Sequence, residues 1–416
     1  MNTAARPVAA MNIDAHDQLT GMIQFLPTVE RILYGAKTVD EHLESEVERL
    51  NGQRVLLLAP RSLQGQSPFQ RVSAILGKRL AASFTAAFEH VPLEIVIEAA
   101  VAARRCDADL VIAMGGGSVI DAGKAVRICL AANLDSSQLL GSFMERREPL
   151  AATLIPQISI PTTLSGSEYT RSFSATDFAA GVKRSYTASA VASRVIMYDP
   201  AATVHTPMAL WLSSGIMAID HALEVLCGSP PHLVGDAMKL SALLALFTNL
   251  PRTRQAPDDL ESRLRCQIAA WLADHSPIRT QPLRPATPAL PSHALAYELA
   301  ALCRLPYGLT ACLTLPASMR WTAAREPEVL ARQAEVARSL GLVPRDAPDQ
   351  TASNGLTDKL QTLLANLGLP TRFHEVDISH EQLRLVASRF AQRGACLISG
   401  QAATESQVIS LLEDAL

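Results

Sequence analysis

Short apolar runs separated by helical stretches organise the first half of the chain. RVLLLAP (54–60) is an apolar run that ends at a proline, and LEIVIEAAVAARRCDADLVIAMGGG (93–117) contains two further runs. Such runs are typical of strands that are buried on both faces of a parallel sheet. We interpret the second segment as strand, helix and strand, and TLIPQISIPTT (153–163) and SRVIMYDP (193–200) as further strands. Strands that alternate with helices predict a mostly parallel α/β sheet.

The pattern changes after residue 200. Helical periodicity marks MKLSALLALFTNL (238–250), LESRLRCQIAAWLADH (260–275) and DKLQTLLANLGL (358–369), and convincing strand patterns end. We therefore expect a flexible leader at 1–20, an α/β domain at 21–200 and an all-helical domain at 201–416. The proline-rich stretch at 279–293 is expected to be a loop inside the helical domain.

Composition narrows the classes of function. The net charge is −3 and no basic run stands out, so nothing favours a nucleic acid or an anionic membrane as partner. The seven cysteines are scattered without a CxxC pair, which is typical of free thiols in a reducing cytoplasm. The first residues lack the apolar segment of a secretory signal, and no apolar run is long enough to span a bilayer. We expect a soluble cytoplasmic protein that acts on a small molecule.

A glycine-rich turn lies between a predicted strand and a predicted helix. Gly115, Gly116, Gly117 and Ser118 let the backbone approach a ligand closely, and the free N–H groups of the helix favour an anion such as a diphosphate. Asp121 and Lys124 follow in the first turns, where Lys124 could reach a phosphate or a ribose. The alternative is a tight turn without a ligand. The pattern is neither GxGxxG nor a P-loop.

A second polar loop, IPTTLSGSEYT (160–170), follows another predicted strand. Its hydroxyl groups and Gly166 would by themselves indicate a turn or helix cap as readily as a site. Two such loops at the carboxyl ends of strands are what a nucleotide crevice in an open sheet requires.

Taken in order, the motifs resemble a known family. GGGSxxDxxK, PTTxxGSE, YDP and GxxAxxHAxE resemble the iron-containing (group III) alcohol dehydrogenases, and within them the maleylacetate reductases, over about residues 22–416. The resemblance implies a Rossmann-like dinucleotide-binding domain, a helical C-terminal domain of the dehydroquinate synthase-like type, an active site in the cleft between them, and a homodimer.

The resemblance also assigns the cofactor site. The glycine turn with Ser118 would hold the diphosphate of NAD or NADP. Asp121, Thr162, Thr163 and Leu164 would line the nicotinamide and adenosine portions. After the first strand the family often has an acidic residue that excludes NADP. Pro60 and Arg61 stand there in this chain, and an arginine is compatible with a 2′-phosphate, so the choice of cofactor stays open.

The segment IMAIDHALE (216–224) contains half of a metal site. A carboxylate one helical turn before His221 would complete a pair of ligands, but Met217 stands there. The family's four ligand positions map to Met217, His221, His293 and Tyr307, and a further active-site histidine maps to Tyr297. Iron(II) and zinc need at least three N, O or S donors from the protein, and a thioether and a neutral phenol are poor substitutes. We therefore expect no metal, and a polar cleft in which His221, His293, Tyr297 and Tyr307 are catalytic.

Three functions fit these features. The first is a metal-independent NAD(P)H-dependent oxidoreductase that reduces a small, carboxylated oxo or enone substrate, with a side chain as proton donor in place of a Lewis acid. The second is non-redox chemistry, an elimination or cyclisation, in the same cleft. The third is a nucleotide-binding pseudoenzyme that acts through partner contacts.

Overall fold

The computed structural model describes residues 29–150, 152–229, 231–274, 290–303, 305–394, 396–398 and 401–415. The predicted leader at 1–20 and most of the proline-rich stretch lie outside these ranges. Contacts divide the chain into two compact units. We call Leu26–Trp211 with Ala256–Trp271 the α/β unit, and Leu212–Gln255 with Leu272–Leu416 the helical unit. The sequence-based division at residue 200 would assign 201–211 and 256–271 to the helical part, whereas their contacts group them with the sheet.

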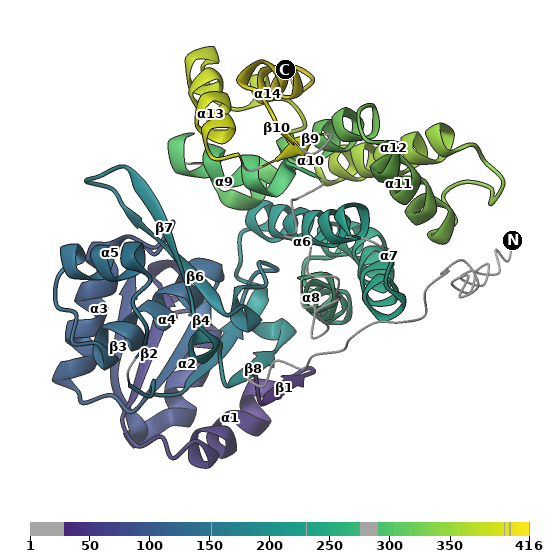
Figure 1. The fold of residues 1–416 in the computed structure, drawn as a ribbon. Coiled ribbons are helices and arrows are strands. Elements are labelled where there is room, and N and C mark those ends of the chain that lie inside the picture. The colour runs from purple at the N-terminus through teal and green to yellow at the C-terminus, as the bar shows by residue number, and fades with distance from the viewer. Residues whose placement is uncertain are drawn as a thin grey trace, which may run out of the picture. The chain divides into compact units, whose positions relative to one another are not determined.

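The α/β unit is built on a six-stranded sheet in the order β1-β8-β5-β4-β2-β3 (Figure 1). All of its neighbouring strands are parallel, as the alternation of strands and helices predicted. The strands are β1 (Arg31–Tyr34), β2 (Val55–Pro60), β3 (Leu80–Ala86), β4 (Leu110–Gly115), β5 (Gln157–Pro161) and β8 (Val195–Tyr198). A separate antiparallel hairpin consists of β6 (Ser172–Asp177) and β7 (Val182–Thr187).

Helices connect the strands of this unit. They are α1 (Thr38–Arg49), α2 (Ser67–Leu76), α3 (Leu93–Arg105), α4 (Gly117–Ala131), α5 (Ser137–Arg146) and α8 (Leu260–Asp274), of which residues to Trp271 belong to the unit. Short 3₁₀ turns lie at Arg61–Leu63, Gly77–Arg79, Ser167–Tyr169, Ser189–Val191 and Pro200–Thr203. The side chain of Arg263 on α8 donates to the carbonyl oxygen of Thr203, and Gln267 donates to that of Pro161. These bonds explain why α8 belongs with the sheet.

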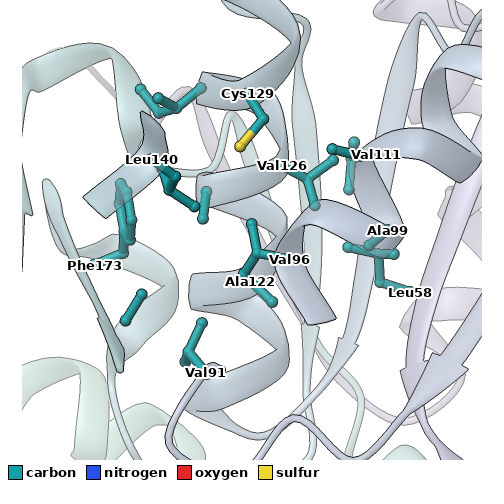
Figure 2. Packing of buried hydrophobic residues seen from close by; sticks show 14 of the residues in the cluster. Leu58, Val91, Val96, Ala99, Val111, Ala122, Val126, Cys129, Leu140 and Phe173 are labelled. Atoms are coloured by element: carbon teal, nitrogen blue, oxygen red, sulfur yellow. The ribbon is translucent and has the colours of Figure 1, made fainter. Parts of the chain in front are cut away.

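The two faces of the sheet bury separate hydrophobic cores. On one face Val96 and Ala99 of α3 pack with Ala122 and Val126 of α4 against the strands (Figure 2). On the other face side chains of α1 and α2 pack against the same strands, in a cluster that includes Leu43, Val47 and Val72. Because β2, β4 and β5 are covered on both faces, nearly all of their residues are apolar, which explains the continuous apolar runs in the sequence.

One predicted strand is wrong. The segment Leu93–Glu98 begins α3, and the strand before it is β3, which the sequence interpretation missed. The β-branched IVI run suggested a strand, but the buried positions of α3 recur every three or four residues, the spacing of one helix face. β3 lies at the edge of the sheet and is only half buried, so it lacks an apolar run.

The helical unit contains the expected helices. They are α6 (Met208–Gly228), from Leu212 on, α7 (Leu233–Gln255), α9 (Ser292–Cys303), α10 (Tyr307–Ala323), α11 (Pro327–Ser339), α12 (Asp349–Leu367), α13 (His380–Gln392) and α14 (Glu405–Glu413). A 3₁₀ turn lies at Phe373–Glu375, and β9 (Leu397–Ile398) pairs with β10 (Gln401–Ala402). The helices α6 and α7 are long and apolar enough to cross a membrane, and 78% of the apolar window of α6 and 44% of that of α7 are buried inside the protein.

Candidate functional site

The glycine turn forms where β4 ends and α4 begins. β4 is buried throughout and ends at Gly115, Gly116 is extended, and α4 starts at Gly117. The backbone N–H of Thr162 donates to the carbonyl oxygen of Gly115 over 2.9 Å, which joins the turn to the loop after β5. The two loops predicted to form a nucleotide crevice are therefore adjacent.

Glycine is required in this turn because the second loop packs directly against it. A Cβ atom at Gly116 would lie 3.1 Å from Cγ2 of Thr163, and one at Gly117 would lie 2.7 Å from Oγ of Ser165. The Ser165 hydroxyl oxygen is buried and has no hydrogen-bond partner among the described residues. A buried polar atom without a partner next to a helix N-terminus suits a polar ligand, and a dinucleotide diphosphate fits these residues.

The strand order places the glycine turn at a position where open α/β sheets bind nucleotides. From β2 the chain proceeds to β3 at one edge of the sheet, and from β4 it proceeds to β5 on the other side. The point between β2 and β4 is thus a topological switch point, where open α/β sheets bind ligands at the carboxyl ends of their strands. Pro60 ends β2 beside Gly115, and the exposed Arg61 follows it.

One of the remaining candidates in this unit differs from expectation. The Lys124 side chain is fully buried and cannot reach a phosphate or ribose as the sequence suggested. It cross-links the loop instead, because its ammonium group donates to Asp121, Ser167, Thr170 and Ser172. Asp121 also accepts hydrogen bonds from the Ser167 hydroxyl and the backbone N–H of Ser174. Both residues therefore hold the loop in place. Thr162, Thr163 and Leu164 are buried in the same loop, and Ser118 is half buried at the start of α4.

Lys183 is a candidate that the sequence interpretation missed. It lies on β7 opposite Thr176, and its charge interacts with Asp121. Burial lowers the pKa of Lys183, and Asp121 opposes this shift. Asp121 lies in the second turn of α4, the helix that begins at the glycine turn, so this cation acts on the start of α4. The sequence offered little indication of this residue. Lys183 follows Gly181 by two residues, in a hairpin that the pattern of apolar runs did not predict.

The helical unit brings the other four candidates together. His221 lies on α6, His293 and Tyr297 lie one turn apart on α9, and Tyr307 begins α10. The Tyr307 hydroxyl lies 3.0 Å from Nε2 of His293, and the rings of His221 and His293 have centroids 4.9 Å apart. Tyr297 meets the Tyr307 ring edge to face at 6.4 Å. We call these four residues the polar cluster. All four residues are half buried.

Gly308 explains how α10 comes so close to α6. A Cβ atom at Gly308 would lie 2.7 Å from the backbone carbonyl carbon of Ser213 and 2.9 Å from the backbone nitrogen of Ser214. The backbones of the two helices are therefore in direct contact where α10 begins. The sequence interpretation did not single out Gly308, although it follows Tyr307 directly.

Burial dominates the electrostatics of this region. It lowers the pKa of His221 to about 4, and the nearby charge of Lys239 acts in the same direction. It raises the pKa of Asp220 to about 7, against a smaller opposing interaction with Ser292. At neutral pH His221 is therefore an uncharged imidazole, able to accept or donate a proton according to its tautomer.

The residues at the family's metal positions do not fit a metal. Met217 is buried and offers only a thioether, and the Tyr307 phenol is hydrogen-bonded to the ring nitrogen of His293. Two imidazoles remain, which is fewer than the three donors that iron(II) or zinc requires. Across the described part of the chain, no group of three or more His, Cys, Asp or Glu side chains could hold an ion.

Two family models match most of the chain. Residues 29–200 match the family Iron-containing alcohol dehydrogenase, and residues 211–416 match the C-terminal part of the Fe-containing alcohol dehydrogenase family. A maleylacetate reductase from Burkholderia cepacia is 30% identical over 348 residues, which cover 83% of this chain and 87% of that protein.

Solved structures have the same fold. The maleylacetate reductase of Agrobacterium tumefaciens has a TM-score of 0.72 at 25% identity, over 95% of this chain and 98% of that one. A sulfoacetaldehyde reductase from Bifidobacterium kashiwanohense in complex with NAD⁺ has a TM-score of 0.78 at 20% identity, over 95% of this chain and 99% of that one. The sequence-based prediction of the fold is confirmed.

Proposed function

Because the chain belongs to the iron-containing alcohol dehydrogenase family, we propose that it is a metal-independent reductase of a small carboxylated oxo or enone compound. Its class is an oxidoreductase similar to the maleylacetate reductases. The proposal of metal-independent reduction rests on one observation. Tyr307 and His293 stand at two of the family's metal-ligand positions, and in this chain they are hydrogen-bonded to each other.

The chemistry of a carbonyl or enone explains why that bond matters. When hydride adds to such a group, negative charge develops on oxygen and must be stabilised by a Lewis acid or by a proton donor. The Met217 thioether and the Tyr307 phenol make a poor metal site, but the phenol is a suitable hydrogen-bond donor. The side chains at the ligand positions therefore favour a proton donor, rather than a metal ion, as the group that stabilises this charge.

The cofactor proposal is NADH or NADPH bound at the glycine turn. The relative from Bifidobacterium kashiwanohense, which is known with NAD⁺, supports a nicotinamide dinucleotide. The N-terminus of α4, the orphan hydroxyl of Ser165 and the charge of Lys183 support a site for its diphosphate. An exposed Arg61 after β2 is compatible with either cofactor.

We assign roles in this chain as follows. When bound, NADH or NADPH would supply a hydride to the electron-poor carbon of the substrate. The Tyr307 hydroxyl donates a hydrogen bond to the oxygen on which charge develops and then passes it a proton. His293, in the tautomer protonated at Nε2, donates a hydrogen bond to the Tyr307 oxygen and replaces the proton that the phenol gives up, and the ring of His221 lies next to that of His293. Tyr297 packs against Tyr307 and keeps its ring in place.

A direct assay tests the proposal. The purified chain is incubated with NADH or NADPH and maleylacetate, with and without a chelator, and cofactor oxidation is followed by absorbance. We expect turnover that chelation does not reduce. Turnover that is lost on chelation and restored by iron or zinc contradicts metal independence. Tight NADH binding without oxidation, over a panel of oxo and enone acids, contradicts the reductase assignment.

A further inference from the structure

The start of α10 has no side chain where it meets the backbone of α6. The atoms nearest to a Cβ at the buried Gly308 would be the carbonyl carbon and oxygen of Ser213, at 2.7 and 2.8 Å, and the backbone nitrogen of Ser214, at 2.9 Å. Backbone atoms inside a helix cannot rotate away as the end of a side chain can. To bring 2.7 Å to an ordinary contact of 3.4 Å, even an alanine at this position must displace a helix by at least 0.7 Å.

The contacted peptide belongs to the face of α6 that carries one residue of the polar cluster. Ser213, Met217 and His221 follow one another at intervals of four residues, so they lie on one face of the helix. The contact with Gly308 therefore lies about two turns before His221. Because Tyr307 opens α10 and directly precedes Gly308, a displacement of α10 at this contact moves the Tyr307 ring as well.

The same part of α10 is also joined to α9. The Thr310 hydroxyl lies within hydrogen-bonding distance of two carbonyl oxygens, that of Tyr307 in its own helix at 2.7 Å and that of Ala296 on α9 at 3.1 Å. One helical turn further on, the hydroxyl of Thr314 lies 3.1 Å from that of Ser292 on α9. The first turns of α10 are thus held between α9 and the backbone of α6.

We propose that Gly308 is a positioning residue of the reaction, because its missing side chain sets how close α10 lies to α6 and thereby where the phenol of Tyr307 stands. The bond from this phenol to His293 is 3.0 Å long, and at about 3.6 Å such a contact is no longer a hydrogen bond. A misplacement of about 1 Å can cost about 100-fold in rate. The displacement that a Cβ imposes is of this order, so Gly308 acts through Tyr307 without touching the substrate.

This inference rests on the proposed function for its kinetic test, and a spectroscopic test is independent of it. The kinetic test compares the parent with Gly308→Ala and Gly355→Ala, using maleylacetate and NADH. Gly355→Ala is the matched control, because its Cβ would lie 2.8 Å from Cγ1 of Val343 and so crowds α12 in the same unit. The atom that it meets is the end of a side chain, which can give way.

We expect Gly308→Ala to lower kcat about 100-fold, with little change in KM for maleylacetate or in the affinity for NADH. Gly355→Ala should behave as the parent. A parental kcat for Gly308→Ala overturns the inference and leaves the reductase assignment intact.

A double variant shows whether Gly308 acts through Tyr307. Gly308→Ala combined with Tyr307→Phe should turn over no more slowly than Tyr307→Phe alone, because the hydroxyl that Gly308 positions is already absent. If the two losses multiply instead, Gly308 acts independently of Tyr307 and the inference is wrong.

The second test observes the hydrogen bond itself and needs no substrate. A ¹H–¹⁵N spectrum of protein labelled with ¹⁵N-histidine records the ring Nε2 of His293, which is assigned by its loss in His293→Gln. Tyr307→Phe gives the position of this signal without the bond. We expect Gly308→Ala to shift the signal toward that position, and Gly355→Ala to leave it at the parental one.

This spectrum decides the role of Gly308 even if the parent does not oxidise NADH with maleylacetate. A parental signal in Gly308→Ala overturns the inference, and so does a parental signal in Tyr307→Phe, because the bond is then absent in solution. If Gly308→Ala does not fold, Thr310→Val takes its place in both tests, since the hydroxyl that it removes joins the same turn of α10 to α9.

Discussion

The phenol oxygen of Tyr307 lies 3.0 Å from Nε2 of His293, although 14 residues separate them in the sequence. Two helix starts produce this contact, since His293 lies in the first turn of α9 and Tyr307 opens α10. The bond connects one imidazole of the polar cluster to the phenol that we propose as proton donor.

Removal of that hydroxyl should slow the reaction. Tyr307→Phe keeps the ring, and with it the edge-to-face contacts with His293 and Tyr297, but cannot donate to the substrate oxygen. We expect kcat to fall about 100- to 1000-fold, the usual effect of losing one donor to an oxyanion. Steady-state kinetics with maleylacetate measure it, and fluorescence titration with NADH should give parental affinity.

Tyr297→Phe is the matched comparison. Its ring packs on that of Tyr307 at 6.4 Å, and we expect a smaller reduction of kcat for this variant. If both variants turn over at the parental rate, the tyrosines are structural and the proton comes from His221, His293 or water.

The purified protein should carry no stoichiometric iron or zinc. The reason is that only two of the family's four metal-ligand positions carry an imidazole in this chain. We expect a double variant, Met217→Asp with Tyr307→His, to gain metal, because it restores an i, i+4 carboxylate and imidazole pair on α6 and a third imidazole on α10. Elemental analysis after dialysis checks both statements. About one tightly bound transition metal in the parent, lost in His221→Ala, would count against them.

Dinucleotide binding should depend on the absence of a side chain at Gly116. Valine there would press on Thr163, whose Cγ2 lies 3.1 Å from a Cβ at this position, and would move the two loops apart. Each lost hydrogen bond to a charged diphosphate costs about 1.5–3 kcal/mol, so we expect NADH affinity to fall at least tenfold.

Gly141→Ala is the control for this substitution. The residue lies inside α5, where a Cβ would be 3.6 Å from Leu93, an ordinary contact, and alanine favours helices. We expect parental NADH affinity for this variant by fluorescence titration. Parental affinity in Gly116→Val as well would show that the cofactor binds elsewhere.

Lys124→Met should destabilise the α/β unit and leave the helical unit unaffected. The ammonium group donates to Asp121 on α4 and to three groups between Ser167 and Ser172, two of them the backbone carbonyl oxygens of Ser167 and Ser172. Without it these partly buried acceptors keep only the Thr170 hydroxyl, whose single proton serves one of them at a time, so the other is left unpaired at about 1–3 kcal/mol. Urea denaturation followed by circular dichroism should show an earlier transition. An unchanged midpoint would mean that water replaces the ammonium group.

The sequence by itself determined the elements that depend on local chemistry. The buried apolar runs of β2, β4, β5 and β8 predicted strands because these strands are covered on both faces, and Gly115–Gly117 marked the strand-to-helix turn. The substitution of two metal ligands was also visible, because Met217 and Tyr307 stand at fixed spacings from two histidines.

Only the tertiary structure decided what depends on contacts between distant segments. The IVI run in α3 satisfied a strand pattern and a helix pattern alike, and packing on the sheet selected the helix. The sequence suggested that Lys124 contacts a phosphate, but in the structure it is buried and makes four hydrogen bonds, so its role is structural. Lys239 stands in a helical stretch of ordinary periodicity, and its complete burial was not visible in its own sequence context. The reason is physical: hydrogen bonds, burial and charge act across space, whereas a sequence pattern reports only the neighbours along one strand or helix.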